Sequence, residues 1–156
     1  MVLTQEVKDR IREEFEDFKT KMYAGKTKEE RRKLGQFFTP PDISIQMIER
    51  FEVESLSGQR ILDPACGSGN LLAACLLAGA DSDKVFGNDY DKLMVQACRE
   101  RLDNLCTKYN LPKIRPWQIH QGDGTQADSY RFSKETSDRW IDKMPDKPTG
   151  FNFFNI

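Results

Sequence analysis

The sequence predicts an α/β fold with an incomplete parallel sheet, preceded by a helical segment. Three observations favour this fold class. From residue 60 onward, short apolar segments alternate with longer segments of helical periodicity. A glycine-rich turn between Asp63 and Gly69 joins the first apolar segment to the first helical one. A second acidic residue, Asp89, follows the next apolar segment. Such alternation is typical of parallel strands joined by right-handed crossovers.

The N-terminal part of the chain is predicted to be helical. Apolar residues recur at helical spacing over residues 4–24, with charged residues between them, and Gly25 ends the pattern. The helix either packs on the core of its own domain, which is the commoner use, or docks onto a partner. We assign residues 1–34 to an N-terminal helical segment and residues 35–156 to the main domain, whose sheet stops after a fourth strand.

The next helix is expected to begin at the double proline Pro40-Pro41, because proline is tolerated in the first turn of a helix but not in its interior. Thr39 is then the expected N-cap. The residues predicted to be buried on this helix are Ile43, Met47, Ile48 and Phe51.

The remaining elements follow from the same alternation of patterns. Strands are predicted over residues 60–63, 84–88, 115–121 and 151–156. Helices are predicted over residues 70–78 and 92–109, with a shorter one around Trp140. In the longer helix Asp91 is the expected N-cap, and the apolar stripe comprises Leu93, Met94, Ala97, Leu102 and Leu105.

Composition narrows the range of functions. The 156 residues include 24 basic and 25 acidic side chains, so the overall basic excess typical of a dedicated nucleic-acid binder is absent. Four cysteines without a Cys-x-x-Cys pair and one histidine argue against zinc, and we expect no metal. The cysteines lie in apolar segments, as reduced thiols of a cytoplasmic protein do. The longest apolar run, residues 71–80, is too short to cross a membrane.

The segment Asp63-Pro64-Ala65-Cys66-Gly67-Ser68-Gly69 is the clearest candidate for a ligand site. Its glycines allow a ligand to approach the backbone closely, and the following helix offers free N–H donors. Asp89, 20 residues after Gly69, ends the second predicted strand, where a carboxylate can accept hydrogen bonds from ribose hydroxyls.

The charge of Asp63 decides between nucleotide ligands. A carboxylate beside the glycine turn repels a pyrophosphate but attracts an ammonium group, and the third glycine of a dinucleotide site is replaced by Leu72. No Gly-Lys-Ser/Thr sequence is present, so a P-loop is excluded. S-adenosylmethionine has an ammonium group and no phosphate, and it is the expected cofactor. The alternative is a glycine turn that only reverses the chain, which leaves the paired positions of Asp63 and Asp89 unexplained.

The glycine segment resembles motif I of the adenine-N6 DNA methyltransferases, in particular the modification subunits of type I restriction systems. Gly35-Gln36-Phe37-Phe38-Thr39-Pro40 resembles their motif X, which precedes motif I in this family. The resemblance covers about residues 30–125. It implies a Rossmann-like fold that depends on S-adenosylmethionine.

The resemblance also implies roles by position. The motif X residues would hold the methionine end of the cofactor; they are Gln36, Phe38, Thr39 and Pro40. The motif I residues would lie against its amino-acid portion; they are Asp63, Ala65, Gly67, Ser68 and Gly69.

The other end of the cofactor is expected at the second and third strands. Asp89 would bind the ribose and Tyr90 would flank the adenine. Gly122-Asp123-Gly124 resembles motif III, so Asp123 would accept a hydrogen bond from the cofactor's adenine amine, with Gly124 beside it. Gly-Asp-Gly is also an ordinary turn sequence.

The catalytic motif of the family, Asn/Asp-Pro-Pro-Tyr/Phe, has no counterpart, because no Pro-Pro dipeptide follows Pro41. We therefore assign no catalytic residue. One hypothesis is the cofactor-binding part of an enzyme of restriction-modification, in which a partner or a missing segment supplies this motif and the DNA contacts. The other is a non-catalytic cofactor-binding, decoy or regulatory protein. Motif X argues against a third, a methyltransferase for small molecules or proteins. A protein partner or second copy is expected to cover the edge of the fourth strand.

Overall fold

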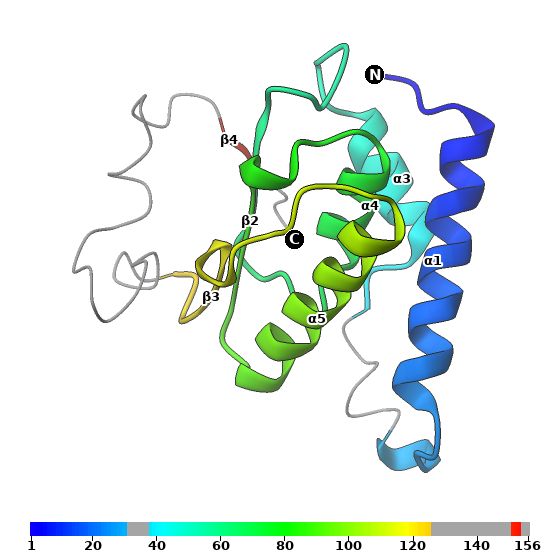
Figure 1. Cartoon of the computed structure of the whole chain (residues 1–156), viewed down its shortest axis with the longest axis vertical. Coiled ribbons are helices and arrows are strands. Elements are labelled where there is room, and N and C mark those ends of the chain that lie inside the picture. Colours follow the sequence, from blue (N-terminus) through cyan, green and yellow to red (C-terminus); the bar gives the residue numbers. More distant parts are fainter. Residues whose placement is uncertain (31–37, 126–150, 154–156) are drawn as a thin grey trace.

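The computed structural model describes residues 1–30, 38–125 and 151–153, and it confirms the α/β class with a parallel sheet. The four strands are β1 (Arg60–Asp63), β2 (Val85–Asp89), β3 (Ile119–Gln121) and β4 (Phe151–Phe153). They are arranged in the order β3-β2-β1-β4. Figure 1 labels β2, β3 and β4 beside the helices.

All neighbouring strands in the sheet run parallel. Asp63 of β1 pairs with Gly87 of β2, and Asp89 of β2 pairs with Gln121 of β3. On the other side of β1, Leu62 pairs with Phe153. The carboxyl ends of the strands therefore meet at one edge of the sheet, which is where an open α/β sheet binds its ligands.

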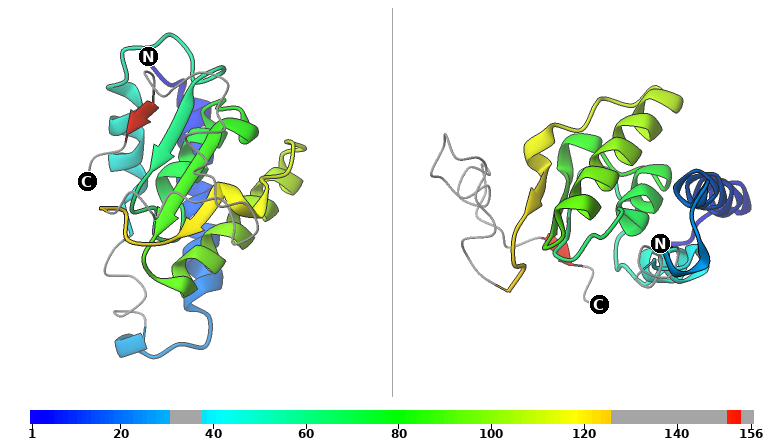
Figure 2. Two further views of the ribbon diagram at one scale, coloured as in Figure 1. Left: turned by 90° about the vertical axis from the view of Figure 1, so that its left-hand side faces the viewer. Right: turned by 90° about the horizontal axis from the view of Figure 1, so that it is seen from below.

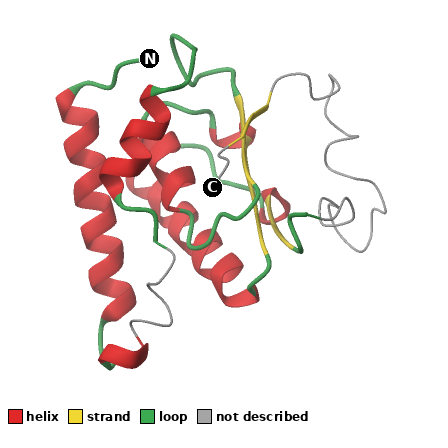
Figure 3. Cartoon of the chain, turned by 180° about the vertical axis from the view of Figure 1, so that it is seen from behind, coloured by secondary structure: helices red, strands yellow, loops and turns green. Residues whose placement is uncertain are grey.

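The α-helices of the described residues lie on one side of the sheet (Figures 2 and 3). Helices α4 (Asn70–Leu77) and α5 (Lys92–Lys108) pack directly against the strands. Helices α1 (Gln5–Tyr23) and α3 (Pro41–Glu49) pack against α4 and form an outer layer. Every residue of α4 is buried, as expected of a helix with neighbours on all sides.

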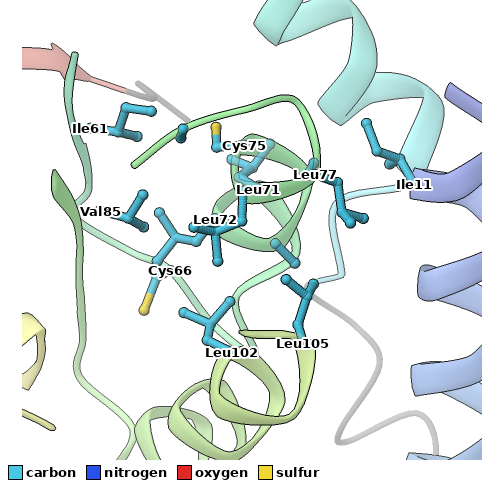
Figure 4. Close-up of a cluster of buried hydrophobic side chains, with 14 of the residues drawn as sticks. Ile11, Ile61, Cys66, Leu71, Leu72, Cys75, Leu77, Val85, Leu102 and Leu105 are labelled. Carbon is cyan, nitrogen blue, oxygen red and sulfur yellow. The ribbon is translucent and has the colours of Figure 1, made fainter. Parts of the chain in front are cut away.

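A single hydrophobic core joins these layers (Figure 4). Leu72 of α4 and Leu102 of α5 are fully buried between the strands and the helices, beside Ile61 and Val85 of the sheet. Ile11 of α1 belongs to the same core. The N-terminal helix thus packs on its own chain, while the division of the chain at residue 34 stays a prediction, since residues 31–37 lie outside the described ranges.

The prediction that Thr39 caps the second helix is wrong. The N-cap is Pro40, which has an extended backbone and makes no capping hydrogen bond from its side chain. The reason is that a residue before proline is driven out of the helical region, so only the second of two prolines can occupy the first helical position. Ile43 is 44% exposed, and Ile45 takes its place in the core.

The predicted stripe of α5 is shifted. Leu93 is 64% exposed because it lies in the first turn, where Asp91 caps the helix by accepting a hydrogen bond from the Leu93 N–H. Leu102 and Leu105 are buried as predicted, whereas Met94 and Ala97 are only half-buried. The rest of the buried face consists of Val95, Cys98, Arg101 and Cys106.

Two predicted strands begin late. Residues 116–118 form a turn of 3-10 helix, so β3 starts at Ile119 rather than at residue 115. Pro116 lacks the N–H that a strand would use, and it occupies the first turn instead. Similarly, residues 82–84 form a 3-10 turn before β2. The predicted helix around Trp140 and residues 154–156 of the fourth strand lie outside the described residues. Among the helices that the structure describes, none has the length and apolar character needed to span a bilayer.

Candidate functional site

The loop that connects β1 to α4 forms the centre of the candidate site. Gly67 and Gly69 both have left-handed backbone angles, with φ of 51° and 82°, which favour glycine. A Cβ at Gly69 would lie 2.7 Å from Cys98 Sγ, so this glycine also allows close packing against α5. A Cβ at Gly67 would meet no atom within 4 Å. The loop is therefore packed tightly on one side, and its backbone at Gly67 faces open space.

Asp89 joins the end of β2 to this loop. Its Oδ2 accepts a hydrogen bond of 2.7 Å from the Gly67 N–H, and its Oδ1 accepts one of 2.9 Å from the Asp91 N–H. Each carboxylate oxygen has a further lone pair, so the side chain retains capacity for a ligand hydroxyl. The end of the second strand and the glycine turn are thus in direct contact.

Asp63 lies fully buried at the end of β1, where its Oδ1 accepts a 3.1 Å hydrogen bond from the Ala65 N–H. Burial raises the pKa of the Asp63 carboxyl to about 7, and the nearby charge of Asp89 adds to this effect. In the described part of the chain no cation forms an ion pair with Asp63. A positively charged ligand group would relieve the cost of ionising this buried carboxyl.

The loop after β3 packs against the loop after β1. The Gly122 N–H donates a 2.9 Å hydrogen bond to the Asp89 carbonyl oxygen, and Asn88 Nδ2 donates to the carbonyl oxygens of Gly122 and Pro64. A Cβ at Gly124 would lie 2.5 Å from the Pro64 carbonyl oxygen. Only glycine therefore allows the two loops to approach this closely.

Two of the predicted adenine contacts face solvent beside these loops. Tyr90 is 79% exposed, and its ring is available for stacking. Asp123 is exposed, and its Oδ1 accepts hydrogen bonds from the N–H and the hydroxyl of Thr125, which lower the pKa of the Asp123 carboxyl. Both residues border the Asp89 end of the site.

The described part of motif X contacts the start of the helix that follows this loop. Asn70, the first residue of α4, donates a 3.2 Å hydrogen bond from Nδ2 to the Thr39 carbonyl oxygen. The ring of Phe38 lies 6.1 Å from that of Phe18 on α1, and Pro40 begins the turn into α3. Gln36 lies outside the described residues.

Ser68 contributes a buried hydroxyl group to the loop between β1 and α4. Its side chain is buried, and within the described residues its hydroxyl oxygen has no hydrogen-bond partner. The Ala65 N–H donates a hydrogen bond to Asp63, which fixes the position of Ala65 in the loop. The structure thus brings the described candidates at 63–69, 89–90 and 123–124 to one edge of the sheet, and Thr39 is joined to them through Asn70. The Phe38 ring instead contacts α1. The roles of these residues in binding stay predictions.

Sequence reasoning missed three polar residues that hold the site together. Asn88 joins the loop after β1 to the loop after β3. Asn70 joins motif I to motif X. Arg101 is buried beneath the loop after β1. In the sequence, Asn88 and Arg101 could have been found as polar residues in otherwise apolar segments. Asn88 lies within an otherwise buried strand, and Arg101 lies on the core face of α5.

The donor set suits a small ligand with a cationic amino-acid end and a nucleoside end. A buried carboxyl that forms no ion pair within the described residues, a glycine turn, a strand-end carboxylate and an exposed aromatic ring lie along this edge. No cluster of three or more His, Cys, Asp or Glu side chains suited to a metal ion occurs within the described ranges. The fold and this edge define a partial Rossmann-like methyltransferase domain.

Comparison with known proteins identifies the family. A family model for N-6 DNA Methylase matches residues 11–115, and the chain belongs to that family. The Type II methyltransferase M.VspI of Vibrio sp. (strain 343) is 27% identical to it over 122 residues. The aligned region is 75% of this chain and 28% of M.VspI, so the chain spans little more than a quarter of the length of this relative.

Proposed function

We propose that the chain binds S-adenosylmethionine and forms the cofactor-binding part of an adenine-N6 DNA methyltransferase of a restriction-modification system. The observation that carries the proposal is the joint position of Asp63 and Asp89 around the Gly67 loop. The Gly67 N–H contacts Asp89 at 2.7 Å, and Asp63 lies buried at the base of the same loop. Membership of the N-6 DNA Methylase family supports the same ligand.

In this proposal each loop holds a different part of the cofactor. Asp63 attracts the ammonium group, while Phe38, Thr39 and Pro40 border the methionine end. Asp89 accepts from the ribose hydroxyls, and Tyr90 and Asp123 flank the adenine. When bound, S-adenosylmethionine supplies an activated methyl group; the residues of this chain bind and orient it.

Transfer to adenine requires a group that holds the target amine. In the family this group belongs to Asn/Asp-Pro-Pro-Tyr/Phe, and the 156 residues contain no Pro-Pro dipeptide after Pro41. We propose that a partner polypeptide or a further segment supplies this motif together with the DNA contacts, which fits the absence of a net basic charge. The four buried free thiols favour a reducing compartment, the cytoplasm.

A second candidate function is a non-catalytic one, with which the lack of a net basic charge in the 156 residues is also consistent. The same candidate site residues would then sequester or sense S-adenosylmethionine, or the chain would act as a decoy for a complete methyltransferase. Both candidates require cofactor binding, and they differ only in methyl transfer.

Calorimetry of the 156-residue chain with S-adenosylmethionine and, separately, NAD tests cofactor binding. We expect S-adenosylmethionine to bind and NAD not to bind, because a pyrophosphate is repelled at Asp63. Asp89→Ala should weaken binding, while the control Asp83→Ala, at an exposed residue of the turn before β2, should not. Equal binding of both nucleotides, or no binding of S-adenosylmethionine, would refute the proposal.

A radiolabelled transfer assay on unmethylated DNA separates the two candidates. The enzyme hypothesis expects no transfer by the chain alone and transfer when a polypeptide with the missing motif is added. The non-catalytic hypothesis expects none in either case. Transfer by the chain alone would contradict both.

A further inference from the structure

A buried arginine links the N-terminal helix to the candidate site. The side chain of Arg101 on α5 is only 2% exposed. Its Nε donates a 3.0 Å hydrogen bond to Glu14 Oε1, and its Nη2 donates a 2.6 Å bond to Glu14 Oε2. Glu14 lies on α1, so this two-point ion pair joins α1 to α5. Such planar pairing fixes orientation as well as charge.

The third nitrogen of the same guanidinium reaches the glycine loop. Arg101 Nη1 donates to Asn70 Oδ1 and, at 3.5 Å, to the Ser68 carbonyl oxygen. Asn70 in turn donates from Nδ2 to the Thr39 carbonyl oxygen. A continuous chain of polar contacts thus runs from Glu14 through Arg101 and Asn70 to the described end of motif X.

Aromatic contacts follow the same path. The Arg101 guanidinium carbon lies 4.0 Å from the centre of the Phe18 ring, one turn of α1 beyond Glu14. The Phe18 ring then meets the Phe38 ring edge to face at 6.1 Å, and Tyr23 contacts Phe38 as well. Helix α1 therefore contacts both segments that the proposed cofactor would touch, one through Arg101 and the other through Phe18.

We propose that Arg101 and Glu14 are positioning residues for the cofactor site, and that α1 is a structural part of that site. The pair holds the loop at 67–70 and the segment at 38–40 in one fixed arrangement, although neither residue reaches the open side of the loop. This inference rests on the proposed function, since it assumes that S-adenosylmethionine is the ligand. Buried ion pairs are poor sources of stability but good sources of fixed geometry, which suits this role.

The test must separate positioning from general stability. Replacing both residues by apolar ones, in the double variant Glu14→Leu with Arg101→Met, removes the contacts to Asn70 and Ser68 without leaving a charge buried. Ile11→Ala is the matched control, because it creates a cavity on the buried face of α1 close to Glu14 in the sequence, and the apolar side chain of Ile11 makes no hydrogen bond to the polar chain. Circular dichroism identifies a temperature at which the unmodified chain and all the variants are folded, and the measurements are compared at that temperature.

Two readouts then decide the question. We expect the double variant to bind S-adenosylmethionine about tenfold more weakly in calorimetry. We also expect faster hydrogen exchange of the amides at residues 67–70 in the ligand-free double variant. Ile11→Ala should change neither. Should the double variant fail to fold, Arg101→Lys, which keeps a cation beside Glu14 but loses the planar contacts to Asn70 and Ser68, should give the same changes at smaller size.

Unchanged affinity and unchanged exchange in the Glu14 and Arg101 variants would overturn the proposal. Equal changes in Ile11→Ala would overturn it too, because the effect would then be general destabilisation. If the unmodified chain does not bind S-adenosylmethionine, the proposed function fails instead. The exchange readout still tests the positioning role in that case.

Discussion

Replacing Asp63 by Asn tests the electrostatics of the candidate site. Asp63 is buried at the end of β1, and its pKa is raised to about 7 from an ordinary value of 3.8, mainly by burial. Asparagine has nearly the same shape and retains an oxygen that accepts from the Ala65 N–H. The substitution therefore removes the ionisation while keeping the local hydrogen bond.

The sign of the effect follows from proton binding. Between pH 3.8 and about 7 the folded chain holds the Asp63 proton and the unfolded chain has lost it. The stability of the unmodified protein is then highest below this window and falls as pH rises through it. The full difference in pKa corresponds to about 4 kcal/mol at most. Asp63→Asn avoids this loss, so its stability relative to the unmodified chain should rise from pH 4 to pH 7 and level off above.

Urea unfolding at pH 5, 6, 7 and 8 measures this difference directly. Asp123→Asn is the control, since Asp123 is exposed and hydrogen bonds from Thr125 lower its pKa, so it stays ionised over this range in both states. We expect a pH-dependent gain for Asp63→Asn and none for the control. If the free energies of unfolding of Asp63→Asn and of the unmodified chain changed in parallel with pH, Asp63 would not be a carboxyl with a raised pKa.

Three further predictions concern the candidate site and the hydrophobic core behind it. Asp89→Ala should weaken the binding of S-adenosylmethionine by about 1.5–3 kcal/mol in calorimetry, because it removes a charged hydrogen-bond acceptor; unchanged affinity would contradict its role. Gly69→Ala should lower the free energy of unfolding by about 1–3 kcal/mol and by more than Gly58→Ala, since both glycines have φ of 82° but only at Gly69 would the new methyl group collide. Leu102→Ala in the core should cost about 2–5 kcal/mol, against less than about 0.5 for exposed Leu93→Ala, and similar losses in the two would refute the observed orientation of α5.

The fold class was predictable because local patterns determine it. Apolar runs bounded by turns located the strands at 60–63 and near 85, and helical spacing located α1 and α5. The continuous apolar run at 70–78 located α4. The errors arose where several residues compete for one role. Both prolines at 40–41 fit a helix start, and only the restriction on the residue before proline selects the second. Leu93 fits the helical stripe by spacing, but its place in the first turn of α5 leaves it exposed.

The candidate site was predictable only where it follows from strand ends. Asp63, the glycine turn and Asp89 are adjacent because parallel strands end at one edge, which the alternation of elements implies. The contacts of Asn88 and Arg101 depend on which residues of distant elements face one another. Glu14 and Arg101 are 87 residues apart, and no local pattern in the sequence pairs them.

On the proposed function, the order of the strands bears on where a completing partner or segment would act. Strand β1 has β2 on one side and β4 on the other, and β4 runs parallel to β1 with Leu62 opposite Phe153. On the proposed function the nucleoside end of the cofactor lies toward β2, beside Asp89 and Tyr90. The β4 side of β1 is then the side left for the target adenine, and the chain leaves β4 at the same edge as the Asp63 loop. A segment that follows β4, or a partner docked along it, reaches the methyl donor by the shortest path, so we expect the missing motif to be supplied from this side.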